Sequence, residues 1–128
     1  MQYLLDTHVL IWWITSDKRL SAKAKALIRN HHNVIYWSAA SSWEVSIKYA
    51  LGRLSFDEPP EDLLPLELHR NHIESLPILN EHAFLAGQLP AHHKDPFDRM
   101  LIAQASIESL GIISNDSKYQ LYDVDVFW

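Results

Sequence analysis

Short apolar runs alternate along the chain with longer segments of mixed hydrophobic and polar residues. The apolar runs at 3–5, 34–37 and 112–114 predict strands, the first of them buried on both faces. Two weaker runs, 73–78 (interrupted by Pro77) and 124–128, predict further short strands. The helices predicted from the segments between them cover 9–14, 22–29, 41–51, 62–70, 81–89 and 96–110. Strands alternating with helices favour the α/β class, with a mainly parallel central sheet and helices on both faces.

Residues suited to helix ends mark several of these boundaries. Residues 41–44 (SSWE) match a capping box at the start of their helix, and Gly52 is placed to end that helix in the left-handed region. Asn80 is predicted to cap the helix over 81–89. Asp95 precedes a proline and is the expected N-cap of the next helix, which Gly111 is predicted to end.

Composition indicates one folded domain over residues 1–128. Hydrophobic residues make up 48% of the chain and charged residues 21%, and the turn-rich stretch 56–60 is too short for an interdomain linker. The chain has no cysteine, which excludes a disulfide framework, a thiolate zinc site and a cysteine nucleophile. Absence of cysteine is compatible with a reducing cytoplasm, where we expect the protein to act. No apolar run is long enough for a membrane span.

The charges are unevenly distributed. The net charge of −5, taken alone, argues against a generic nucleic-acid binder. Residues 18–53, however, carry seven basic residues and one acid, whereas residues 54–98 carry nine acids and two basic residues. The basic segment 18–53 is suited to following a phosphate backbone, or its lysines and arginines are simply the exposed face of a helix.

Four carboxylates follow or open elements that a parallel sheet brings to one edge. Such sheets bind ligands beyond the carboxyl ends of their strands. Asp6 directly follows the first strand, Glu44 lies in the first turn of the helix after the second, and Asp116 closely follows 112–114. Asp98, the third residue of its helix, joins them if that helix starts at the same edge. We therefore expect these four side chains to form one cluster.

Clustered carboxylates repel one another, so protons or cations must compensate their charge. Oxygen ligands without thiolates suit Mg²⁺ or Mn²⁺, ions that activate a bound water and stabilise the oxygens of a phosphate under attack. The chemistry indicated is hydrolysis of phosphodiester bonds. Each acid also has an ordinary interpretation, with Asp6 as a helix cap, Glu44 completing its capping box and Asp116 in a turn.

Four motifs, in this order and at these separations, resemble a PIN domain. They are residues 4–8 (LLDTH), 41–44 (SSWE), 95–105 (DPFDRMLIAQA) and 114–116 (SND). The long central motif is similar to the VapC toxins of bacterial and archaeal toxin–antitoxin pairs. The resemblance implies a three-layer α/β/α fold and an endoribonuclease that depends on Mg²⁺ or Mn²⁺ and cuts selected structured RNA. It also implies a homodimer and a cognate antitoxin of the VapB type.

Site residues are carried over by position. The family's acidic quartet corresponds to Asp6, Glu44, Asp98 and Asp116, with Asp6 and Asp98 as the direct metal ligands. The hydroxyl neighbours expected to orient these carboxylates are Thr7 and Ser114. Candidate RNA contacts are His8, Lys48 and Arg99. Many PIN domains have asparagine in place of His8 and threonine in place of Ser114.

Three other functions use the same residues. Some PIN relatives act on DNA or flap structures, which a comparison of RNA and DNA substrates would separate. A non-catalytic module that binds nucleic acid or another protein would bind RNA without cutting it, although the presence of all four acids counts against this. A phosphatase with Asp6 as nucleophile is disfavoured because position 8, where an Asp-x-Asp motif needs its second aspartate, is histidine.

Overall fold

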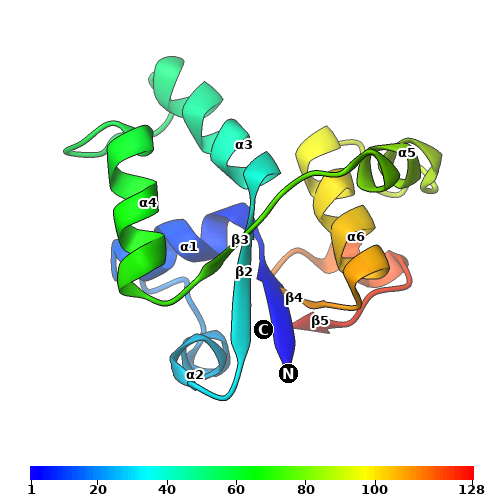
Figure 1. Ribbon diagram of the computed structural model, residues 1–128, viewed down its shortest axis with the longest axis horizontal. Coiled ribbons are helices and arrows are strands. Elements are labelled where there is room, and N and C mark those ends of the chain that lie inside the picture. The colour runs from blue at the N-terminus through cyan, green and yellow to red at the C-terminus, as the bar shows by residue number, and fades with distance from the viewer.

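The computed structural model describes residues 1–128 as a twisted sheet flanked by helices (Figure 1). The strands are β1 (Gln2–Leu5), β2 (Val34–Ser38), β3 (Glu74–Leu76), β4 (Gly111–Ile113) and β5 (Val126–Phe127). The helices are α1 (Thr7–Ile14), α2 (Ala22–Arg29), α3 (Ala39–Ala50), α4 (Pro60–Arg70), α5 (Asn80–Gln88), α6 (Pro96–Glu108) and the short 3₁₀ helix η1 (Ser117–Leu121). None of the helices has the length and hydrophobicity needed to cross a membrane.

The sheet is parallel throughout, in the order β3-β2-β1-β4-β5. In the central strand β1, Leu4 pairs with Tyr36 of β2 on one side and with Ile112 of β4 on the other. The chain adds β2 and β3 on one side of β1 and then crosses to the other side for β4 and β5. This reversal creates a topological switch point between β1 and β4, the position at which open parallel sheets bind ligands. The predicted three-layer α/β/α class is confirmed.

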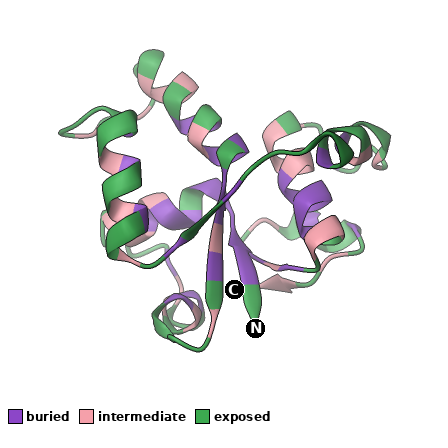
Figure 2. Ribbon diagram, viewed as in Figure 1, coloured by how far each residue is buried: buried purple, intermediate pink, exposed green.

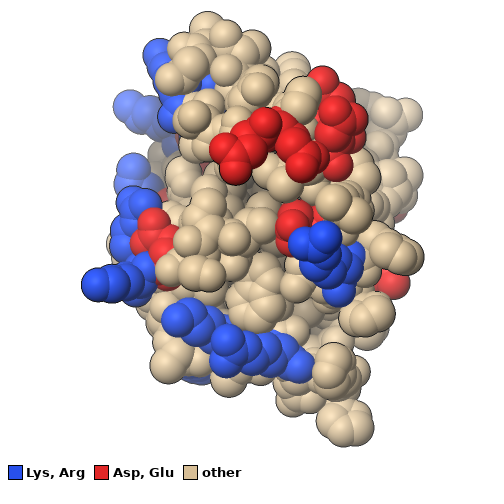
Figure 3. All heavy atoms as spheres, turned by 90° about the vertical axis from the view of Figure 1, so that its left-hand side faces the viewer, with Lys and Arg blue, Asp and Glu red and all other residues tan.

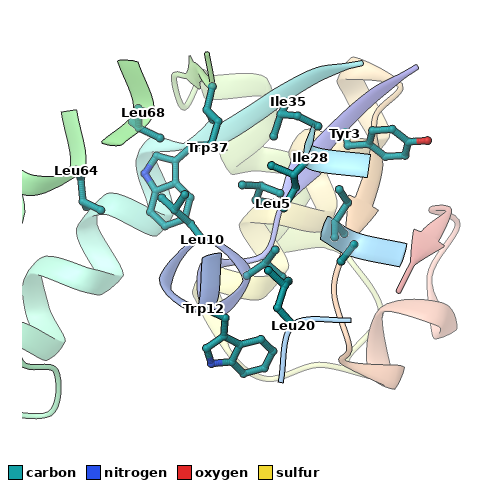
Figure 4. Close-up of a cluster of buried hydrophobic side chains, with 14 of the residues drawn as sticks. Tyr3, Leu5, Leu10, Trp12, Leu20, Ile28, Ile35, Trp37, Leu64 and Leu68 are labelled. Atoms are coloured by element: carbon teal, nitrogen blue, oxygen red, sulfur yellow. The ribbon is translucent and has the colours of Figure 1, made fainter. Parts of the chain in front are cut away.

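Hydrophobic clusters cover both faces of β1, as its continuous apolar run predicts. On one face Leu5 packs with Ile35 of β2 and Ile28 of α2, in a cluster that extends to α1 and α4 (Figure 4). On the other face Leu4 packs against Leu101 and neighbouring residues of α6. Figure 2 shows how burial concentrates in β1 and in the helix faces around it. The end of β1 is therefore rigidly held from both sides.

The capping box predicted at residues 41–44 is wrong. Helix α3 begins at Ala39 and is capped by Ser38, whose hydroxyl accepts a hydrogen bond from the Ala40 amide. Strand β2 leads directly into the helix, so the serine at the strand end takes the capping role. Ser41 is consequently free to turn inward, where it is fully buried. Gly52 does follow the helix with a positive φ of 73°, as predicted.

Two other predicted helix ends also differ. Asn80 is the first residue of α5 rather than its cap, and the amide of the N-cap residue Leu79 donates to the ring Nδ1 of the buried His82. Helix α6 ends at Glu108, its C-cap Ser109 adopts the left-handed conformation, and Gly111 begins β4. Gly111 is required there for packing, because a side chain at this position would collide with the ring of Phe127.

Several elements start or stop a few residues from their predicted bounds. Helices α1 and α4 each begin two residues earlier than predicted, because Asp6 and Pro59 occupy their N-cap positions. Strands β3 and β5 are shorter than the predicted runs 73–78 and 124–128. Both lie at the edges of the sheet and pair with one neighbour each.

Replacing Gly111 with alanine should destabilise the fold. A Cβ at this position would lie 2.7 Å from Cε2 of Phe127 and 3.1 Å from Cδ1 of Tyr3. Overpacking of this kind costs about 1–3 kcal/mol, which urea unfolding followed by tryptophan fluorescence would measure. Gly87→Ala is the matched control: it lies in α5 with open space around it and should gain up to about 1 kcal/mol. Equal stability of the two variants would contradict this packing role.

Candidate active site

The four predicted carboxylates lie beyond the carboxyl ends of the strands, each on a different element. Asp6 follows β1 and is the N-cap of α1, and Asp116 follows β4 and is the N-cap of η1. Asp98 is the third residue of α6, after the N-cap Asp95. Glu44 lies in the second turn of α3, not the first, because that helix starts earlier than predicted. Asp6 and Glu44 are buried, and Asp98 and Asp116 are half-buried.

Ser114 joins the ends of β1 and β4. Its hydroxyl donates to Oδ2 of Asp6 at 2.7 Å and accepts from the amide of Asp116 at 3.0 Å. The other oxygen of Asp6, Oδ1, accepts from the Thr7 amide at 2.7 Å. Asp6 is thus oriented by hydrogen bonds at both of its carboxylate oxygens.

Glu44 is held in a similar way on the α3 side. The Thr7 hydroxyl donates to Glu44 Oε1 at 2.8 Å and lies 2.9 Å from the hydroxyl oxygen of Ser41. Nζ of Lys48, one turn further along α3, donates to Glu44 Oε2 at 2.7 Å. Lys48, a predicted RNA contact, therefore neutralises an acid of the site in this structure.

His93 bridges the remaining two acids. Its Nε2 lies 3.1 Å from Asp98 Oδ2 and 2.9 Å from Asp116 Oδ2, and the potential ligand atoms of the three side chains all lie within 4.8 Å of one another. The amide of Asp95 donates to Nδ1 of the ring, so Nε2 carries the proton and donates it to Asp116. The hydroxyl of the fully buried Tyr119 donates to Asp98 Oδ1 at 2.6 Å.

Sequence analysis did not assign His93 or Tyr119 to the site. His93 lies in the loop before α6, five residues before Asp98. This closeness in sequence to a predicted acid is the one feature that could have identified His93 as a site residue. Tyr119 belongs to η1, and nothing in the local sequence indicates that its hydroxyl reaches across to α6. Both side chains are buried, which is why their polar atoms must find partners within the protein.

Burial makes the acids at the centre of the site hard to ionise. The pKa of Asp98 is raised to about 7, mainly by burial. The negative charges of Asp6 and Asp95 also raise this pKa, whereas the hydrogen bond from Tyr119 lowers it. Burial also raises the pKa of Asp6, with a further contribution from Glu44. These acids lie close enough to repel one another, and a cation among them would relieve that repulsion.

Asp116 behaves in the opposite way. Partial burial opposes its ionisation, but hydrogen bonds from the Lys118 amide and from His93 lower its pKa overall. Asp116 is therefore more readily negative than Asp6 and Asp98, and it is more exposed than Asp6.

Arg99 and His8, two predicted RNA contacts, differ in their surroundings. The Arg99 guanidinium donates to four backbone carbonyls, those of Ala86, Leu89, Pro90 and His93, at 2.7–3.2 Å. It thereby fixes the loop that carries His93. His8 is exposed next to Asp6, and its ring stacks on Trp12 with the centroids 5.9 Å apart.

The basic segment 18–53 does not form one continuous surface. Arg19 pairs with Asp17, Lys48 pairs with Glu44, and Arg29 lies over the ring of Trp13. Figure 3 shows basic side chains in several separate groups on the α2 and α4 side of the molecule, with acidic side chains near the top of this face and also among the basic groups. Individual basic residues, rather than the segment as a whole, are therefore available to a phosphate backbone.

A model of the PIN domain matches residues 3–125. The chain belongs to the PIN domain family. The resemblance inferred from the four sequence motifs is thereby confirmed. The match covers β1, β4 and all four acids at the switch point, so the site described above lies entirely within the PIN domain.

Known proteins similar to this PIN domain include two ribonucleases of Mycobacterium tuberculosis. The chain is 28% identical to ribonuclease VapC22 over 120 residues, 90% of this chain and 87% of that protein. It is 35% identical to ribonuclease VapC16 over 68 residues, which span about half of each protein (50% and 48%). Among solved structures, VapBC2 from Rickettsia felis bound to a promoter DNA fragment superimposes with a TM-score of 0.73, at 18% identity, over 100% of this chain and 99% of that one.

Loss of the Arg99 guanidinium should destabilise the fold. Arg99→Met keeps an aliphatic stem but leaves four carbonyls without their donor, so we expect a loss of about 2–4 kcal/mol in the free energy of unfolding. Urea unfolding would measure it, with the exposed Arg53→Met as the matched control. A variant as stable as the wild type would leave Arg99 free to contact a ligand instead.

The raised pKa of Asp98 predicts a stability that falls as the pH rises. Between about pH 4 and pH 7 the folded protein keeps a proton on Asp98 that the unfolded chain releases, so ionisation favours unfolding by at most about 4 kcal/mol. Thermal unfolding of metal-free protein at pH 5 and pH 8 should show a smaller difference for Asp98→Asn than for the wild type. Asp57→Asn, at an exposed position, should show the same change in stability between pH 5 and pH 8 as the wild type. If Asp98→Asn also shows the full wild-type change, Asp98 is not the source of the pH dependence.

Proposed function

We propose that this PIN domain is a metal-dependent endoribonuclease toxin of the VapC type, which hydrolyses phosphodiester bonds in selected structured RNA. The observation that carries the proposal is the acidic cluster at the switch point, where Asp6 and Asp98 resist ionisation because they are buried together. A fold does not bring such groups together without a compensating charge. The similarity to proteins named ribonucleases supports RNA as the substrate.

The residues of the site fit a hard divalent cation. All four acids offer oxygen ligands and no thiolate is present, the donor set that Mg²⁺ and Mn²⁺ prefer. Asp6 and Asp98 would hold the ion directly, with Glu44 and Asp116 completing the acidic surroundings. Such an ion, when bound, activates water and stabilises the charge that develops on the phosphate oxygens.

The chain's own side chains fix the geometry that this chemistry requires. Ser114 and Tyr119 each hold one oxygen of a proposed direct ligand by a hydrogen bond. Thr7 does the same for Glu44, while Lys48 offsets part of its charge. Carboxylates restrained in this way lose little side-chain entropy when an ion binds.

We further propose that the protein acts in the cytoplasm as a homodimer and is neutralised by a cognate antitoxin of the VapB type. Beyond the family resemblance, an apolar hollow of about 190 Å³ supports a protein partner. It lies between α3 and α6, close to the acids, and is lined by Ala40, Trp43, Ile78, Pro96, Phe97 and Met100. Trp43 is 63% exposed, which is unusual for so large an apolar side chain and is typical of an interface residue.

Replacement of Asp98 tests the nuclease. Brief expression of the wild type in a growth-competent host should arrest growth and produce a few discrete RNA 5′ ends across the transcriptome. Asp98→Asn should abolish these ends while the protein remains folded, because it removes a metal ligand and one charge of a repulsive cluster. In purified protein, chelator should stop cleavage and added Mg²⁺ or Mn²⁺ should restore it.

Asp57→Asn, an exposed acid outside the site, should cut like the wild type. A folded Asp98→Asn that still cuts would overturn the assignment of the site. Wild-type protein that produces no new RNA ends, but cleaves a DNA of matched sequence and ends, would identify a DNA nuclease. Binding of RNA without cleavage, insensitive to chelator, would identify a binding module.

A further inference from the structure

A polar hollow of about 310 Å³ opens directly beside Asp116, on the β5 side of the site. Asp116 and Ser114 form its boundary with the acidic cluster, and Lys23, Asn115, Gln120 and Trp128 contribute further walls. Its volume is at the lower end of the range for ligand pockets, about 300–1,000 Å³, and therefore suits a single small unit rather than a folded partner. None of these further wall residues has been given a role in the site.

The free groups in this hollow match the parts of a nucleotide. Trp128 provides an indole, the type of side chain on which bases stack. Asn115 and Gln120 provide two exposed amides, neither of which makes a side-chain hydrogen bond within the protein. Lys23 is the one basic residue that lines the hollow, and its ammonium group makes no ion pair. An aromatic side chain, two unpaired amides and a cation are together the elements of base and phosphate recognition.

Two of these groups, Trp128 and Lys23, also contact neighbouring rings before any ligand binds. The Trp128 ring packs edge-on against Trp12 with the centroids 5.8 Å apart, and Arg19 covers another part of the Trp12 ring at 4.9 Å. Nζ of Lys23 lies 5.5 Å from the ring centroid of Phe127, next to Trp128 in the chain. Less side-chain freedom therefore has to be lost on binding than for flexible surface residues.

A second hollow with similar groups provides a useful contrast. It has a volume of about 300 Å³ and is lined by Trp12, Trp13, Lys25 and Arg29 among others, but by none of the four acids. A nucleotide there would not be adjacent to the reacting phosphate. Lys25 lies two residues from Lys23 on the same helix and has the same charge, which makes it a matched control.

We propose that the hollow beside Asp116 binds one nucleotide of single-stranded RNA, the nucleotide next to the bond that is cut. Its base stacks on Trp128, the amides of Asn115 and Gln120 hydrogen-bond to its polar edge, and Lys23 contacts a phosphate. The assignment of RNA rests on the proposed nuclease function. The hollow therefore restricts which nucleotide is accepted at this position and contributes to the selection of the cleavage site.

The test measures RNA binding separately from cleavage. The probe is a fluorescein-labelled single-stranded RNA hexamer of mixed sequence, and the parent protein is full-length Asp98→Asn with Mg²⁺, in which cutting is blocked. Fluorescence anisotropy gives the Kd for the parent and for Lys23→Ala, Gln120→Ala and Trp128→Leu made in it. We expect each change at Lys23 and Trp128 to weaken binding at least about fivefold, since one stacked base or one phosphate contact is lost.

Controls separate the subsite from general effects of charge and folding. Lys25→Ala should change the Kd less than twofold, and Trp128→Phe, which keeps an aromatic ring, should bind more tightly than Trp128→Leu. Lys23 and Gln120 are exposed, so their variants test the subsite even if loss of Trp128 disturbs packing against Trp12. Circular dichroism of each variant should match that of the parent.

Three results would overturn the subsite. The first is parent-like binding by both Lys23→Ala and Trp128→Leu. The second is an equal loss for Lys23→Ala and Lys25→Ala, which would indicate general electrostatic attraction. The third is a parent that does not bind the hexamer. All three leave the nuclease standing if wild-type protein still produces Asp98-dependent RNA ends, so failure of the subsite and failure of the proposed function are distinguishable.

Discussion

The burial of Asp6 at the end of the central strand is the constraint around which the site is arranged. A carboxylate directly after β1 lies between two hydrophobic clusters, and removal from water disfavours its charge. Two hydrogen bonds to the Asp6 carboxylate offset part of this cost. Their donors are the amide of Thr7 at the start of α1 and the hydroxyl of Ser114, which follows β4. The position of the acid and its hydrogen bonds thus follow from one feature of topology, the reversal of strand order beside β1.

The other three acids are also held by hydrogen bonds from neighbouring side chains. Glu44 shares Thr7 with Asp6, and Asp116 shares Ser114 with it, so two hydroxyl residues link three carboxylates. Asp98 enters from the opposite layer and is held by Tyr119 and His93. Lysine charges lie at the periphery, Lys48 beside Glu44 and Lys118 near Asp116. The centre of the cluster remains uncompensated by the protein, which is the electrostatic condition that a divalent cation satisfies.

The sequence alone allowed the fold class and the position of Asp6 and Asp116 at one sheet edge to be predicted, because these follow from local signals. Apolar runs define β1 and β4, and their connectivity places Asp6 and Asp116 at one edge whatever the exact strand lengths. The capping box at Glu44 was wrong, since Ser38, Ser41 and Ser42 are all chemically able to cap and only tertiary packing selects Ser38. Pairing of Tyr119 with Asp98 spans 21 positions and depends on how η1 returns to α6, which no local pattern encodes.

Stability and chemistry are linked through the loop that precedes α6. Arg99 fixes its carbonyls, Tyr122 accepts from the His93 amide and donates to the carbonyl of Pro90, and the ring of His93 in turn reaches two acids. The same loop therefore supports the fold through its backbone and the site through one side chain. Neutralising Asp6 or Asp98, whose ionisation burial disfavours, relieves repulsion and strengthens the fold, but it also removes charge that attracts a cation. The site can keep its acids only because the surrounding hydrogen bonds and the two hydrophobic clusters stabilise the rest of the domain enough to offset their repulsion.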